Sequence, residues 1–312
     1  MTALVLATSA SAGKTGGNVV ALVTAEQQNQ LIAVELPSGK ILRRVALARG
    51  PENVAVWRTK VVVASPASGA VTLLDGHGPY LGPIKVFRGF EAPHIVATSS
   101  RRGLAYVTDD PRGELSVIGL GSRRLIARIR VGVGAHHMSI SPDGHHMWIA
   151  LGERATSIAV VDLSPATRPR LLRRFSPGFA AHDLTFSPDG RRVWVTSASE
   201  DSVHVLNART GREAFAVRVG SGPQHVAFAH PNGSAFVTSG YSSRIVKVDP
   251  ASGRILARAR TPYGSFNLSS MGDLVTTTSL LNGTVTEFDV NLRRLLTVKA
   301  ADSARGIAVT VW

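Results

Sequence analysis

Half of the ten histidines of this chain lie in one short phrase that recurs seven times. They are His94, His136, His137, His182 and His225. The third residue of the phrase changes from copy to copy, and these residues are Asn53, His94, His137, Asp183, His225, Asn267 and Gly306. Imidazole and carboxylate together suit zinc, iron, nickel or copper as ligands. They are equally suited to general acid–base chemistry, because histidine titrates near neutral pH.

The copies of the phrase are roughly forty residues apart, a period that is typical of propellers and solenoids. Each unit contains four short apolar runs separated by turn signals, as in 138–141, 146–151, 156–163 and 170–175. Turns such as Pro142-Asp-Gly favour the positive φ angles that tight hairpins need. The pattern therefore predicts four β-strands in every unit.

The two ends of the chain are out of phase with the repeat. The first apolar run, 19–24, matches the second strand of a unit, and the missing first strand is supplied by 306–312. Sharing one blade between both ends would close the ring and remove an open sheet edge. We therefore predict an all-β fold, a seven-bladed β-propeller with four antiparallel strands per blade, closed by N- and C-terminal strands that share one blade. We expect 18–312 to form this single domain, and 1–17 to be a flexible tail or the remnant of an export signal.

Four of the predicted second strands carry a related tetrapeptide. The sequences are Tyr106-Val-Thr-Asp, Trp194-Val-Thr-Ser, Phe236-Val-Thr-Ser and Leu22-Val-Thr-Ala. With the Ser-Pro-Asp-Gly turns before some of them, they resemble the YVTN repeat family of β-propellers, including YncE-like proteins. The resemblance extends from about residue 19 to residue 312. It implies a propeller fold, and the family includes binding proteins, surface-layer proteins and lactonase-like enzymes.

In a propeller the first strand of every blade lines the central channel, so the variable residues should form a ring at one channel mouth. The loops between the second and third strands open on the same face, and they carry Glu26, Asp109, Asp110, Glu153, Glu200, Asp201 and Tyr241. The predicted ligand-binding mouth consists of Asn53, His94, His136, His137, His182, Asp183, His225 and Asn267. The candidate metal ligands are His94, His137, Asp183, His225, Glu26 and Asp109. In the alternative interpretation, the histidines only fill a solvated ring with hydrogen bonds.

Charge and composition bear on partners. The net charge is +14, and arginines cluster in the predicted fourth strands, where charged side chains protect an exposed sheet edge. The chain has no cysteine, which excludes disulfides and thiolate metal ligands, and no apolar run approaches the ~20 residues of a membrane span. We expect a monomer and favour an extracytoplasmic location, periplasmic or secreted, over the cytoplasm.

Three functions follow from these features. The first is a non-catalytic propeller that binds a small molecule, a peptide or a divalent metal ion at the histidine-rich mouth. The second is a metal-dependent lyase or lactonase at the same mouth. Ala92-Pro-His-Ile with Tyr106-Val-Thr-Asp looks like the pattern of streptogramin lyase-like propellers, and this resemblance implies His94 or His225 as the catalytic base and Glu26 or Asp109 as a metal ligand. The third is a scaffold whose arginine-rich rim contacts protein or nucleic acid.

Overall fold

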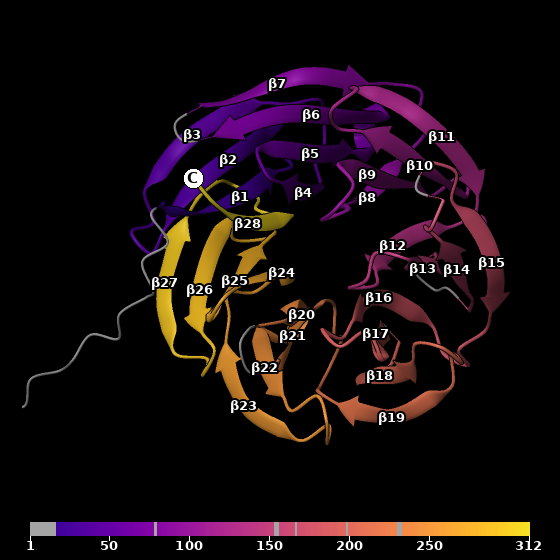
Figure 1. The fold of residues 1–312 in the computed structure, drawn as a ribbon. Coiled ribbons are helices and arrows are strands. Elements are labelled where there is room, and N and C mark those ends of the chain that lie inside the picture. Colours follow the sequence, from indigo (N-terminus) through magenta and orange to yellow (C-terminus); the bar gives the residue numbers. More distant parts are fainter. Residues whose placement is uncertain (1–16, 78–79, 153–155, 166, 198, 230–232) are drawn as a thin grey trace, which may run out of the picture.

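The computed structural model of this protein describes residues 17–77, 80–152, 156–165, 167–197, 199–229 and 233–312. Nearly all of the predicted tail, and Glu153 among the loop residues expected on the face of the mouth, lie outside these ranges. The described strands form seven four-stranded antiparallel sheets arranged as blades around a central axis (Figure 1). We number the blades 1 to 7 in the order in which their inner strands follow from β28, so that blade 1 is β28-β1-β2-β3 and blade 7 is β24-β25-β26-β27.

The strands of each blade run from the channel outward. The inner strands are β28 (Ile307–Val311), β4 (Asn53–Trp57), β8 (Pro93–Thr98), β12 (Ala135–Ile140), β16 (Ala181–Phe186), β20 (Val226–Phe228) and β24 (Ser265–Met271). The second strands are β1 (Val19–Ala25), β5 (Lys60–Ser65), β9 (Leu104–Asp109), β13 (His146–Leu151), β17 (Arg192–Ser197), β21 (Ala235–Ser239) and β25 (Leu274–Ser279).

The outer half of each blade completes the sheet. The third strands are β2 (Gln30–Leu36), β6 (Ala70–His77), β10 (Glu114–Gly119), β14 (Ile158–Asp162), β18 (Ser202–Asn207), β22 (Arg244–Val248) and β26 (Thr284–Asp289). The outermost strands are β3 (Ile41–Ala46), β7 (Tyr80–Phe87), β11 (Arg124–Arg130), β15 (Arg170–Phe175), β19 (Glu213–Arg218), β23 (Ile255–Arg260) and β27 (Arg294–Lys299). Two short 3-10 helices, η1 (Pro66–Ser68) and η2 (Gly240–Ser242), follow the second strands of blades 2 and 6.

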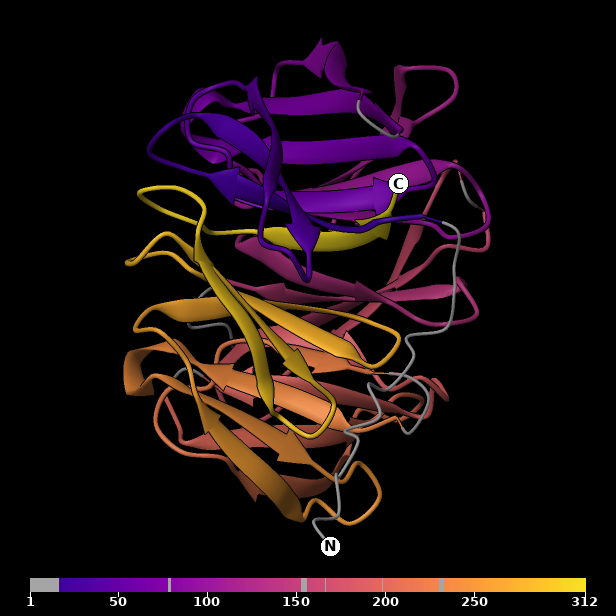
Figure 2. The ribbon, with the colours of Figure 1, turned by 90° about the vertical axis from the view of Figure 1, so that its left-hand side faces the viewer.

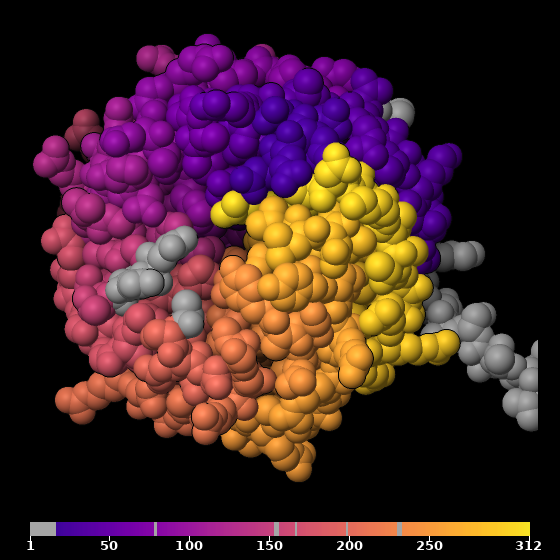
Figure 3. All heavy atoms as spheres, turned by 180° about the vertical axis from the view of Figure 1, so that it is seen from behind, coloured from indigo at the N-terminus to yellow at the C-terminus, as the bar shows by residue number. Residues whose placement is uncertain are grey.

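The predicted closure of the ring is confirmed. Strand β28 pairs antiparallel with β1, with Val23 opposite Ile307 and Val19 opposite Val311. The yellow C-terminal strand accordingly lies against the indigo N-terminal strands in Figure 2, and the indigo and yellow segments adjoin in Figure 3. Both ends of the described chain are therefore hydrogen-bonded into blade 1, which closes the ring of blades.

The core lies between neighbouring blades, where apolar faces of adjacent sheets meet. Trp148 and Trp194 occupy equivalent positions in β13 and β17 and are 1% and 0% exposed. Each indole packs edge-on against a phenylalanine of the next blade, Trp148 on Phe186 and Trp194 on Phe228. Such edge-to-face pairs are favoured by the aromatic quadrupole. The channel itself is lined by the partly exposed inner strands, so polar residues are tolerated there.

Arginines of the outermost strands join four of the blades, 1, 3, 4 and 7, to the blade before them. Four guanidinium groups donate to a backbone carbonyl of the preceding blade, and the pairs are Arg44 with Ala300, Arg128 with Gly89, Arg174 with Val131 and Arg294 with Arg260. A guanidinium offers five donors in a rigid plane, which suits this bridging role better than an ammonium group does. The arginine-rich rim therefore holds the ring together from outside. Among the described residues, no helix has the length and apolar character needed to cross a bilayer.

Candidate functional site

A threonine in the second strand of five blades determines where the recurring phrase lies. These residues are Thr24, Thr108, Thr196, Thr238 and Thr278, and Ala64 and Ala150 take the corresponding positions in blades 2 and 4. The Thr196 hydroxyl accepts a hydrogen bond from the Asp183 amide (3.0 Å) and donates one to the Gln224 carbonyl of the next blade (2.8 Å). The Val-Thr repeat thus clamps the phrase of one blade to the phrase of the next.

A β-bulge in the inner strand turns two residues of the phrase toward the channel mouth. In blade 4 the pairing with β13 passes from Ala135 directly to Met138, so His136 and His137 are left out of the ladder. The same shift occurs in blades 3, 5 and 7. In blade 3 it leaves out His94 and Ile95, so His94 takes the place of His136 and not, as the phrase predicts, that of His137. Bulges re-aim side chains in this way and are common beside functional sites. The strand expected at 138–141 therefore begins earlier, at Ala135, because the residues before the bulge already pair.

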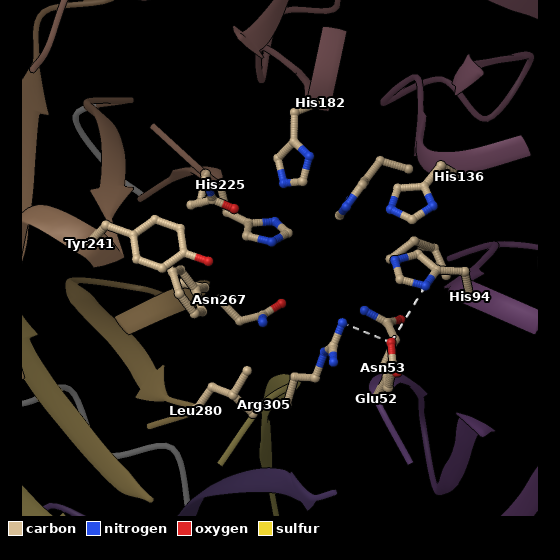
Figure 4. A pocket seen from close by; sticks show the side chains of 14 residues that line it. Glu52, Asn53, His94, His136, His182, His225, Tyr241, Asn267, Leu280 and Arg305 are labelled. Atoms are coloured by element: carbon tan, nitrogen blue, oxygen red, sulfur yellow. Dashed lines mark ion pairs between the residues drawn. The ribbon is translucent and has the colours of Figure 1, made fainter. Parts of the chain in front are cut away.

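The phrase residues surround a cavity of about 180 Å³ at the channel mouth (Figure 4). Seven of the eight predicted mouth residues line it, namely Asn53, His94, His136, His137, His182, His225 and Asn267. Asp183 lies in an adjoining hollow, which His137 and His225 also line. The structure therefore brings all eight residues to one place.

Two overlapping histidine trios lie on one side of this cavity. His94, His136 and His137 form the first trio, and His137, His182 and His225 form the second. Within each trio, one ring nitrogen from each residue lies within 4.8 Å of the others. The rings of His94 and His136 are stacked with centroids 3.8 Å apart. His137 belongs to both trios, and its ring centroid lies 4.7 Å from that of His182 and 5.0 Å from that of His225.

Carboxylates stand behind four of the five rings. His136 Nδ1 lies 2.6 Å from Asp110 Oδ2, and His94 Nδ1 lies 3.5 Å from Glu52 Oε2. Asp183 serves two rings, with Oδ1 3.3 Å from His137 Nδ1 and Oδ2 3.4 Å from His225 Nδ1.

Because Nδ1 faces a carboxylate in these four residues, the remaining ring nitrogen, Nε2, is left for a ligand. A carboxylate at the far nitrogen fixes the tautomer and the orientation of a metal-binding histidine. His182 differs from the other four, since its Nδ1 is buried without a hydrogen-bond partner among the described residues.

Burial governs the protonation of the cluster. Burial, reinforced by the neighbouring imidazoles of His136 and His137, holds the pKa of His94 well below its usual range. Burial likewise keeps the pKa of His137 well below that range and lowers the pKa of His182 to about 4. These three rings are therefore neutral at pH 7, the form in which imidazole binds a metal.

Asp183 stays ionised in spite of its buried position. Burial alone would raise the pKa of this carboxyl, but His225 and His137 hold it well below its usual range. Its Oδ2 also lies 3.2 Å from the Val226 amide, which donates to it. The carboxylate is thus an acceptor for two imidazoles and one backbone N–H, and its oxygens face these groups.

The two loop carboxylates predicted as metal ligands take other partners. Asp109 is 1% exposed and accepts hydrogen bonds from the backbone amides of Glu91 (2.9 Å) and Ala92 (3.0 Å). Glu26 Oε2 lies 2.9 Å from Arg305 Nη1. Neither residue lines the cavity. Asp109 is the last residue of strand β9 and not part of a loop, and both carboxylates face the partners just named.

Several functional residues escaped the sequence analysis, which concentrated on the third position of the phrase. Glu52, Gln224, Phe266 and Arg305 occupy the second position and line the cavity. Their shared position beside His136 and His182 was the signal that could have identified them. Phe266 lies in the bulge of blade 7, whereas Glu52, Gln224 and Arg305 precede the inner strands of blades 2, 6 and 1, whose pairing shows no bulge. The sequence does not show that either arrangement turns this position toward the cavity.

Solved structures of other proteins have the same fold. A functionally unknown protein from Desulfotomaculum acetoxidans aligns with a TM-score of 0.80 at 14% identity, covering 93% of this chain and 98% of that chain. A candidate 6-phosphogluconolactonase from Bacteroides fragilis aligns with a TM-score of 0.77 at 14% identity, covering 96% and 100%. The apo form of AztD from Citrobacter koseri gives a TM-score of 0.73 at 11% identity, covering 95% and 98%. At these identities the likeness shows the fold alone.

Sequence comparison gives the family. No curated protein matches the chain. The family model described as "Lactonase, 7-bladed beta-propeller" matches residues 71–262, which is more than half of the chain. The matched segment runs from the third strand of blade 2 through the outermost strand of blade 6, and it includes every histidine of the two trios. The chain therefore belongs to the family of seven-bladed lactonase propellers.

Proposed function

We propose that the protein binds one divalent transition-metal ion at the channel mouth through Nε2 atoms of the histidine trios. The observation that carries this proposal is the pair of trios that share His137, with carboxylates at Nδ1 of four of the five rings. A solvated ring of structural histidines would not need this arrangement, since single hydrogen bonds to backbone would satisfy each ring. The five rings supply nitrogen ligands only, which suits zinc, copper or nickel better than magnesium or calcium.

The shared residue limits the stoichiometry. His137 Nδ1 faces Asp183, so this ring has one nitrogen to offer to an ion. Two three-histidine sites cannot be filled at once through one nitrogen atom. We therefore expect about one tightly bound ion per chain, held by three protein ligands with a further position open to the cavity, as in zinc sites that carry out catalysis.

Lactone hydrolysis is the second candidate function, and family membership favours it. In this reaction the oxygen of water bonds to the carbonyl carbon, the ring C–O bond breaks, and a proton passes to the departing ring oxygen to give a hydroxy acid. A metal ion bound at the trios would supply Lewis acidity toward the carbonyl oxygen. His94 belongs only to the first trio and His225 only to the second. Whichever of the two does not hold the ion is the candidate base. The finer assignment to YVTN or YncE-like propellers remains a prediction.

Zinc binding by protein purified without an affinity tag tests the metal site. We expect isothermal titration and elemental analysis to give about one zinc ion per chain. His137→Ala should weaken zinc binding by more than about 100-fold, because it removes a ligand from both trios. Loss of only the carboxylate that holds a ligand histidine in place costs roughly 10–100-fold. His77→Ala is the matched control, since this side chain is 62% exposed and lies outside the cavity. Equal zinc affinity in wild type and His137→Ala would contradict the proposal.

A further inference from the structure

The side of the cavity facing His94 and His136 carries aromatic and apolar side chains beside the amide of Asn267. Tyr241 lies across the cavity from His94 and His136 (Figure 4), Phe266 packs against Tyr241, and Leu280 also lines the cavity. Tyr241 is 62% exposed, although its ring and that of Phe266 meet edge to face with centroids 4.8 Å apart. Exposed aromatic surface beside a cavity commonly marks a binding site. We call Tyr241, Phe266 and Leu280 the aromatic shelf.

The aromatic shelf is held in place by the backbone beneath it. Tyr241 belongs to the 3-10 helix η2, and the Gly264 amide donates to the carbonyl of Gly240 (3.0 Å). A Cβ atom on Gly240 would lie 2.3 Å from the Phe266 ring, so only glycine allows this ring to pack so closely. The shelf is therefore preformed, and little side-chain freedom is lost when a ligand binds against it.

The charge at the cavity disfavours an anionic ligand. Arg305 is the one arginine or lysine among the described residues that line it. Its guanidinium is already shared between two carboxylates, with Nη1 2.9 Å from Glu26 Oε2 and Nη2 2.9 Å from Glu52 Oε2. A phosphate entering here would meet the carboxylate of Glu52, and none of the described side chains that line the cavity offers it an uncommitted cation.

Size restricts the ligand further. Pockets for drug-sized molecules enclose about 300–1,000 Å³, whereas this cavity encloses about 180 Å³. A peptide or a large sugar phosphate would exceed this space. A molecule of one or two small rings could place a polar atom at the histidines and its apolar face on Tyr241 and Phe266.

We propose that the site takes a small uncharged lactone or ester that carries a flat apolar ring, with its carbonyl oxygen toward the histidine trios and its ring against the aromatic shelf. The proposal rests on the metal site proposed above for the carbonyl contact. It separates this chain from an enzyme of phosphorylated sugar lactones, which would need a cationic receptor for phosphate. Tyr241 and Phe266 are then the residues that determine specificity.

Competition between three probes tests this assignment on the full-length, zinc-loaded protein. Coumarin is an uncharged aromatic lactone, δ-valerolactone offers a lactone carbonyl group without an aromatic ring, and 6-phosphoglucono-δ-lactone offers a lactone carbonyl group together with a phosphate. We expect coumarin to bind at least roughly tenfold more tightly than the other two, because stacking on Tyr241 and Phe266 adds to the carbonyl contact. Tyr241→Ala should remove most of this preference, and Tyr241→Phe should retain it, since the ring is kept.

Zinc titration of the same variants separates this proposal from the previous one. Tyr241→Ala should bind zinc as wild type does, because Tyr241 belongs to neither histidine trio and its substitution removes no ring nitrogen. Tyr263→Ala is the matched control: this tyrosine is 49% exposed and lies beside Tyr241, but it does not line the cavity. Unchanged coumarin affinity in Tyr241→Ala, or tighter binding of 6-phosphoglucono-δ-lactone than of coumarin, would overturn the ligand assignment even if zinc binds. If wild type binds no zinc, the proposed metal site itself is wrong.

Discussion

Threonine clamps of the same kind hold the phrase on both sides of the channel mouth, yet the side chains of the phrase differ between the two sides. On the histidine side, Thr196 joins the Asp183 amide to the Gln224 carbonyl. On the opposite side, Thr24 joins the Gly306 amide to the Glu52 carbonyl. The clamp uses only backbone atoms of the phrase. Side chains can therefore diverge into a histidine arc and an aromatic shelf without disturbing the ring.

Two buried carboxylates in different blades differ in whether they have hydrogen-bond partners. Asp183, on the histidine side, has two imidazoles and the Val226 amide as partners. Glu287 in β26 of blade 7 is 0% exposed, and both its carboxylate oxygens lack a hydrogen-bond partner among the described residues. Burial, with a smaller effect of Asp273, raises the pKa of Glu287 to about 7. Pairing rather than depth determines whether a buried carboxylate is ionised.

The largest expected effect concerns the unpaired carboxylate. The folded state binds a proton at Glu287 more tightly than the unfolded chain does, so this residue should lower the free energy of unfolding as pH rises from about 4.5 through 7. The loss should reach up to about 3 kcal/mol by pH 8. Glu287→Gln should remove this pH-dependent part, and urea denaturation of both proteins at pH 5 and pH 8 measures it. An equal pH dependence in the two proteins would mean that Glu287 is not protonated in the fold.

The next effect concerns the paired carboxylate and tests it as a positioning residue. Asp183→Asn should keep the bond from the Val226 amide, as Asn53 does for the Val96 amide at the equivalent position of blade 2. It removes the negative charge that orients His137 and His225, so zinc affinity should fall by about 10–100-fold. Zinc titration measures the loss, and thermal unfolding of the zinc-free proteins checks the fold.

Asp189→Asn is the control for this substitution. Asp189 lies in the same blade, at the turn on the other face, where it accepts a hydrogen bond from Ser187. Its substitution should leave zinc affinity unchanged. If Asp183→Asn and Asp189→Asn bind zinc equally well, the histidines do not depend on Asp183 for their orientation.

The smallest effect concerns the clamp that both sides share. Thr196→Val removes the hydroxyl that bridges blades 5 and 6 and leaves a buried amide and a partly buried carbonyl without this partner, so the free energy of unfolding should fall by about 1–3 kcal/mol. Thr72→Val is the matched comparison, since the Thr72 hydroxyl is buried without a partner among the described residues. That substitution should be neutral or stabilising. Equal losses in chemical denaturation would show that the bridging bonds contribute nothing beyond side-chain shape.

Much of the fold could be predicted because the repeat is local. Each turn signal and apolar run specifies its own strand, and the out-of-phase ends, 19–24 and 306–312, showed how the ring closes. The candidate site was predicted less completely. The third position of the phrase pointed to the mouth, but Glu26 and Asp109 were expected in the site and instead pair with Arg305 and with backbone amides.

The sequence by itself determined the number of blades, the closing strand and the side of the ring on which histidines gather, because these depend on the order of residues along the chain. Only the tertiary structure decided which groups meet. Bulges in four inner strands leave two successive residues out of the ladder at the channel mouth, and Asp183 reaches rings of both neighbouring blades. Such contacts depend on the distance between blades and on side-chain direction, which no repeat period encodes.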